Sequence, residues 1–139
     1  MLSYATLARV SPQNNIVIVP DKGNLVFDTI VASAGGAISY DVSTGVITFL
    51  EAGHYYVDWC VTTQAGITEY GNNWALKTSI SGLSVAGSSH TVVSIATGFA
   101  IIEAVENETV RLVNISDKPL TLSGVVKSKA ALSVYLVHA

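Results

Sequence analysis

Apolar and polar residues alternate along most of this chain, which is typical of strands with one buried face. β-branched residues fill many of the apolar positions, and Gly, Ser and Asn recur at intervals of about eight to twelve residues, the turn spacing of sandwiches and barrels. The pattern therefore predicts an all-β fold. The expected strands are Tyr4 to Val10, Ile16 to Val19, Leu25 to Ala32, Ala37 to Tyr40, Val46 to Phe49, Tyr55 to Thr63, Trp74 to Ile80, Thr91 to Ile95, Phe99 to Val105, Thr109 to Asn114, Leu120 to Ser123 and Ala131 to Val137.

Small and polar residues mark the turns between these strands. Ser43-Thr44-Gly45 and Glu51-Ala52-Gly53 are tight-turn signals, since glycine adopts positive φ without steric cost. Asn107 lies at the centre of a turn between two apolar strands and tolerates the left-handed conformation. The segment from Ser81 to Ser89 contains only small, polar or weakly apolar residues, and we predict that it is a surface loop.

The longest predicted strand has one apolar face and one mixed face, because successive side chains of a strand point to opposite sides of the sheet. The apolar set consists of Tyr55, Val57, Trp59 and Val61. The mixed set consists of His54, Tyr56, Asp58, Cys60 and Thr62. We expect the first set to face the interior, where the Trp59 indole N–H needs a hydrogen-bond partner. The second set should meet solvent or a neighbouring subunit.

The composition indicates a surface that is partly covered. The 139 residues suit one domain, residues 1–139, but only 12% are charged against a typical value of about 25%, and the mean hydropathy is +0.48. Either other copies of the chain cover apolar surface or the chain enters a membrane. Its apolar runs fall far short of the ~20 residues of a spanning helix, so we expect self-association and no membrane insertion.

Charge and cysteine content exclude further classes. A net charge of -3 with scattered Lys and Arg residues argues against a nucleic-acid partner. Cys60 is the single cysteine, so no intrachain disulfide can form. The first fifteen residues lack a basic segment followed by an apolar one, and we expect no secretory signal peptide.

The segment from Asn24 to Trp59 resembles the globular head of the complement q-subcomponent and tumour necrosis factor superfamily. The resemblance lies in the order of its motifs, which are Phe27-Asp28, Tyr40-Asp41, Ser43-Thr44-Gly45, Phe49 and Gly53-His54-Tyr55-Tyr56. The stretches Thr97 to Asn114 and Leu132 to Val137 are similar to later strands of that family. The resemblance implies an antiparallel jelly-roll β-sandwich of the TNF-like kind that forms a homotrimer.

The low charge is more similar to the bacterial branch of the superfamily, the C-terminal domains of BclA-like collagen-containing spore-surface glycoproteins. This resemblance implies a structural trimerisation and surface-display domain on the outermost layer of a bacterial spore, the exosporium. It also implies that one sheet faces the three-fold axis, with Tyr56, Asp58 and Cys60 toward the neighbouring subunits. Three acidic groups near one axis repel each other, so Asp58 should be hydrogen-bonded, hydrated or off the axis.

The titratable residues do not predict catalysis. His54 and Asp58 are about 13 Å apart along a strand, too far to share an ion, and His54, His90 and His138 lie on different elements without a catalytic motif. The neighbours of Cys60 suggest an inert, buried thiol, and Glu106 and Glu108 are more typical of solvated charge than of a calcium site. We therefore expect no enzymatic activity, no cofactor and no metal.

Two alternatives remain open at this point. One is a receptor- or glycan-binding module, adhesin-like in function, in which outward loops recognise a host receptor or glycan. Tyr70 and Trp74 flank Gly71-Asn72-Asn73 in a predicted loop and are the candidate aromatic contacts. The other is a jelly-roll enzyme of the cupin kind, for which the clustered histidine ligands are missing.

Overall fold

The computed structural model describes residues 2–12, 15–64, 71–89 and 94–139, and it contains two five-stranded antiparallel sheets. The first sheet consists, in spatial order, of β3 (Thr29–Ala34), β1 (Tyr4–Arg9), β12 (Ala130–His138), β6 (Gly53–Thr62) and β9 (Ile95–Ala104). The second consists of β4 (Ile38–Asp41), β5 (Val46–Phe49), β10 (Glu108–Asn114), β7 (Asn72–Thr78) and β8 (Ser84–Ser89). A short ladder joins β2 (Val17–Val19) to β11 (Leu120–Leu122).

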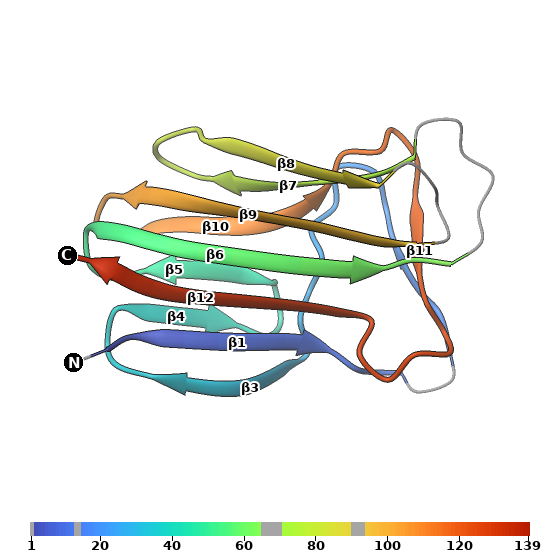
Figure 1. The fold of residues 1–139 in the computed structure, drawn as a ribbon, viewed down its shortest axis with the longest axis horizontal. Coiled ribbons are helices and arrows are strands. Elements are labelled where there is room, and N and C mark those ends of the chain that lie inside the picture. The colour runs from blue at the N-terminus through green and yellow to red at the C-terminus, as the bar shows by residue number, and fades with distance from the viewer. Residues whose placement is uncertain (1, 13–14, 65–70, 90–93) are drawn as a thin grey trace.

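The chain passes repeatedly from one sheet to the other, as a jelly roll requires. It leaves β5 in the second sheet for β6 in the first, returns to β7, and crosses again from β8 to β9 and from β9 to β10. Figure 1 shows the two sheets as stacked layers, with the N- and C-termini at the same end of the sandwich and the β2–β11 ladder at the other end. The all-β antiparallel jelly-roll sandwich expected from the sequence is confirmed.

Large apolar side chains from both sheets fill the space between the layers. Phe49 and Tyr55 stack with ring centroids 4.1 Å apart, and Phe27 and Trp74 are fully buried in the same core. The apolar face of β6 points inward as expected, since Tyr55, Val57 and Val61 are inaccessible to solvent and Trp59 is 4% exposed. Alternation along β6 therefore identified the core-facing residues correctly.

The indole N–H groups of the two tryptophans differ in their hydrogen bonding. Trp74 donates to the Asn72 side-chain oxygen at 2.6 Å, and the Asn72 amide in turn donates to Thr63. The Trp59 N–H is enclosed without a hydrogen-bond partner among the described residues. Its ring lies against Gly87 and Gly98, where a Cβ atom would approach the indole to 2.7 and 2.6 Å. Glycine at both positions makes room for the ring.

Three predicted elements are wrong in detail. The segment from Ser81 to Ser89, predicted as a loop, contains the strand β8, because six residue pairs with β7 outweigh the weak strand propensity of Ser, Gly and Ala. The strand predicted from Phe99 begins earlier, at Ile95, and continues through Gly98 as β9, whereas residues 91–93 of the other predicted strand lie outside the described residues. The predicted strand from Leu25 to Ala32 begins only at Thr29, since Leu25 and Phe27 anchor a crossing between the layers.

The motifs behind the family resemblance prove to be structural. The Asp28 carboxylate accepts the N–H groups of Val10 and Ser11 at 3.0 and 2.9 Å. The Tyr40 hydroxyl bonds to both the N–H and the carbonyl of Phe27, each at 2.7 Å. Gly45 has a φ of 78° in the turn that follows Asp41, as its turn role predicts. The hydrogen bonds of Asp28 and Tyr40 join segments that are far apart in the sequence. The polar groups of both side chains therefore have partners within the chain.

Glu108, the first residue of β10 after the β9–β10 turn, is a buried structural carboxylate. The turn prediction is confirmed, since Asn107 has a φ of 66°. Glu108 is inaccessible to solvent, however, and is not solvated as expected. Its two oxygens accept hydrogen bonds from the N–H groups of Ile80, Ser81 and Val105 and from the Ser81 hydroxyl. With donors on both oxygens, Glu108 is not a free ligand for calcium.

We expect the Glu108 network to make stability depend on pH. Burial acts to raise the pKa of Glu108, but the hydrogen bonds from Ser81, Val105 and Ile80 outweigh it and hold the pKa below its ordinary value. The ionised form therefore stabilises the fold above the unfolded-state pKa of about 4.3, and this contribution is lost as the pH falls through the lower folded-state pKa.

The variant Glu108→Gln tests this interpretation. Because an amide presents N–H groups to donors, the variant should lose about 1–3 kcal/mol of unfolding free energy at pH 7. The difference in unfolding free energy between the variant and the unmodified chain should become smaller in acid. Urea unfolding at pH 7 and pH 3 measures both effects, with Glu106→Gln in the same turn as an exposed control. Equal loss in the two variants would contradict the role of the buried network.

Candidate functional site

The outer face of the first sheet is the most distinctive surface of the described residues. The β6 ladder places Tyr56, Asp58 and Cys60 on this face, opposite residues of β9 on one side and of β12 on the other. Tyr56 lies between Ile101 and Tyr135, Asp58 between Phe99 and Ser133, and Cys60 between Thr97 and Ala131. Directly opposed residues share a face of the sheet, so three adjacent strands form one continuous surface.

Large apolar side chains stand exposed on this face. On β9, Phe99 is 69% exposed, Ile101 64% and Ile95 60%. Tyr135 and Val137 of β12 are also exposed. The rings of Phe99, Tyr56 and Tyr135 form a row across the three strands, with centroid separations of 6.5 and 5.3 Å. Exposed apolar side chains gathered in one place, rather than scattered singly, are typical of a contact surface.

Polar groups are embedded in this apolar surface. The Asp58 carboxylate lies close enough to the Tyr56 hydroxyl to affect its ionisation. Partial burial, together with that carboxylate, raises the pKa of Tyr56, so the phenol stays a neutral donor. A shallow hollow of about 350 Å³ opens here, lined by Tyr56, Asp58, Cys60, Phe99 and Ser133 among others. The Asp58 carboxylate thus lies next to a hydroxyl group of its own chain.

We refer to the surface formed by Tyr56, Asp58, Cys60, Ile95, Phe99, Ile101, Ser133, Tyr135 and Val137 as the apolar outer face. Sequence analysis named only the β6 members of this set. Phe99 and Ile101 lie in a strand that the sequence predicted, but alternation within that strand does not reveal that it pairs with β6. Cys60 is partly exposed here and is not buried as expected.

The predicted aromatic ligand loop is not supported at Trp74. This residue lies in β7, is inaccessible to solvent and is hydrogen-bonded to Asn72, so it cannot contact a ligand from an exposed loop. The prediction was wrong because Asn72 and Asn73, which are typical turn residues, belong to the strand. Tyr70 lies outside the described residues.

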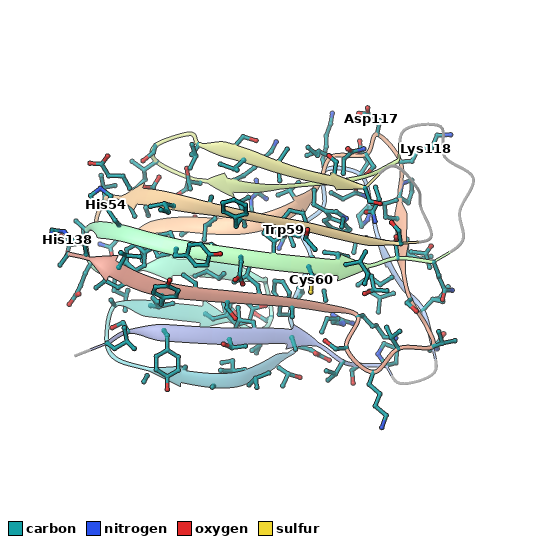
Figure 2. The ribbon with its side chains drawn as sticks, viewed as in Figure 1. His54, Trp59, Cys60, Asp117, Lys118 and His138 are labelled. Atoms are coloured by element: carbon teal, nitrogen blue, oxygen red, sulfur yellow. The ribbon has the colours of Figure 1, made fainter. Side chains whose placement is uncertain are left out.

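Within the part of the chain that the structure describes, no three His, Cys, Asp or Glu side chains are grouped so as to hold a metal ion. Two histidines that the sequence placed on separate elements are nevertheless neighbours. His54 and His138 face each other across β6 and β12 (Figure 2). Among the described residues there is also no helix long and apolar enough to cross a membrane.

Comparison with known proteins identifies the fold. No family model and no curated protein matches this chain. Among solved structures, the globular domain of zebrafish complement 1qA is similar, with a TM-score of 0.68 and 16% identity over 99% of this chain and 98% of that one. Eiger TNF from S. frugiperda has a TM-score of 0.70 at 12% identity, covering 98% and 92%. The PRD1 vertex protein P5 has a TM-score of 0.64 at 14% identity, covering 97% and 96%.

These similarities extend over nearly the whole of each chain, so they show that the complete described sandwich has the TNF/C1q-like jelly-roll fold. At such low sequence identity they show the fold alone. The family resemblance seen in the motifs from Phe27 to Tyr56 is therefore supported at the level of architecture.

Proposed function

We propose that this chain is a non-enzymatic head domain that assembles into a homotrimer through the apolar outer face. The observation that carries the proposal is the exposure of Phe99, Ile101 and Ile95 beside the Tyr56 and Tyr135 rings on one sheet. Each large apolar side chain removed from water contributes about 1.5–3 kcal/mol. A closed three-fold ring lets every copy cover this face without leaving a free edge for further growth.

The low charged fraction supports the same proposal. A low charged fraction predicts that part of the apolar surface is covered by other copies of the chain, and the apolar outer face is a surface of this kind. The hydrogen bonds of Asp28, Tyr40 and Glu108 stabilise a single chain, and the exposed side chains of β9 take no part in them. The side chains of Phe99 and Ile101 are thus available for contact between copies.

We further propose, from the family resemblance, that the domain is the C-terminal head of a BclA-like collagen-containing glycoprotein displayed on the exosporium of a bacterial spore. The position of the termini supports such an arrangement. Both lie at one end of the sandwich, so a preceding stalk would enter there while the opposite end faces outward (Figure 1). A receptor- or glycan-binding role has less support, because its candidate aromatic contact, Trp74, is buried.

Molar mass in solution tests the assembly. Light scattering coupled to size-exclusion chromatography should give three times the chain mass of 14.6 kDa, because covering the apolar outer face favours association. The mass should persist in high salt, since apolar contacts are not screened by ions. A single-chain mass across the micromolar range would refute the proposal, and a dimer would show that the face is paired with two-fold symmetry instead.

A further inference from the structure

A β-bulge brings two histidines together where β12 ends and β6 begins, on two inner strands of the first sheet. Regular pairing of β12 with β6 runs from Ala130 opposite Val61 to Leu136 opposite Tyr55, and would next place Val137 opposite His54. The register shifts instead, and His138 takes that position. A bulge inserts one extra residue and re-aims the side chains beyond it, and bulges are frequent at functional sites.

The geometry of the pair suits a shared ligand. Both side chains are exposed, and their ring centroids are 6.1 Å apart with an interplanar angle of 70°. Directly opposed residues of an antiparallel ladder have Cβ atoms about 4.5–5.5 Å apart. Because imidazole nitrogens bind Zn²⁺ at about 2.0–2.1 Å, side-chain rotation alone can aim one nitrogen of each ring at a common ion.

The third residue of this row adds negative charge. Glu103 of β9 lies directly opposite His54 on its other side and is exposed, so β12, β6 and β9 present His138, His54 and Glu103 in sequence. The described residues do not bring three such side chains close enough to form a complete cluster. A bound ion would thus have two imidazole ligands, with water in its other positions and a carboxylate nearby.

We propose that His54 and His138 form a chelating site for a divalent transition-metal ion, with Zn²⁺ as the representative. Neutral imidazoles suit zinc, copper and nickel rather than calcium or magnesium, which prefer oxygen ligands. The site lies where the chain ends meet the sandwich (Figures 1 and 2). Both ligands belong to one chain, so the proposal does not depend on the homotrimer.

Titration calorimetry with ZnCl₂ tests the site on protein that carries no polyhistidine tag. The unmodified chain should bind one ion per chain at pH 7.5, and His54→Ala and His138→Ala should each weaken binding at least about tenfold, as loss of a direct ligand exceeds loss of an outer partner. The third histidine of the sequence supplies the control, and His90→Ala should bind as the unmodified chain does.

Three outcomes would overturn the proposal. They are absence of binding to the unmodified chain, equal binding by the two alanine variants and the unmodified chain, and a stoichiometry of one ion per three chains. Circular dichroism and molar mass should be unchanged in the variants, since both side chains are exposed. If one variant fails this check, the other still decides the result, because a chelate needs both rings.

Discussion

Replacing Phe99 and Ile101 together by lysine is expected to convert the proposed trimer into single chains. Both side chains are more than 60% exposed in the isolated chain, so the substitutions remove no core contact and should change the stability of the fold itself by only about 0.5 kcal/mol each. In a three-fold assembly each substitution occurs in every subunit interface. Two ammonium groups per chain would be buried there beside one carboxylate, that of Asp58, and burying the remaining positive charge is strongly unfavourable.

Light scattering measures this result directly, with the mass falling to one third of the value of the unmodified protein. Val125→Lys is the matched control, because Val125 is 85% exposed in the loop between β11 and β12 and lies outside the apolar outer face. The control should keep the mass of the unmodified protein. If the double variant also keeps it, this face is not the assembly surface.

Truncation of Trp74 to alanine should cost about 3–5 kcal/mol of unfolding free energy, the range for removing a large aromatic side chain from a core. Trp74 is inaccessible to solvent and completes the hydrogen-bond chain through Asn72 to Thr63. Were it instead an exposed ligand contact, as the sequence suggested, the change would be nearly neutral for stability. Urea unfolding should be measured in the Phe99→Lys, Ile101→Lys background, so that dissociation does not contribute.

A pair of tryptophan-to-phenylalanine variants separates the hydrogen bond from the lost volume. Trp74→Phe leaves the Asn72 oxygen without its donor, whereas Trp59→Phe removes an N–H group that has no partner in the described residues. Both remove the same atoms from a buried ring, so Trp74→Phe should cost more by about 1–3 kcal/mol. Equal losses would show that the Asn72 bond contributes little.

Local patterns predicted local features well. Alternation along β6 assigned Tyr55, Val57, Trp59 and Val61 to the core, and the turn residues Gly45 and Asn107 do adopt positive φ. These predictions succeed because the side-chain period of a strand and the freedom of a turn residue depend on immediate neighbours. The resemblance of the Phe27 to Tyr56 motifs also pointed to the correct architecture, since those side chains join fixed segments of the jelly roll.

Predictions that depended on distant partners were less reliable. Asn72 has a turn-like preference but lies in β7, where its side chain bonds to Trp74 and Thr63. Residues 96–98 were left outside the predicted strands, yet Gly98 continues β9 because it pairs with Trp59 of β6, whose ring leaves no room for a larger residue there. Glu108 is charged but buried, since donors from the β7–β8 turn surround it. In each case a tertiary contact outweighs the local preference.

By itself the sequence determined the all-β class, the inner and outer faces of β6 and an apolar excess that calls for a covered surface. Only the tertiary structure decided that Phe99, Ile101 and Tyr135 extend the Tyr56 surface, and that the bulge near Val137 places His138 opposite His54. The physical reason is that strand register arises from pairing between segments far apart in the chain. Alternation within one strand does not specify its neighbours.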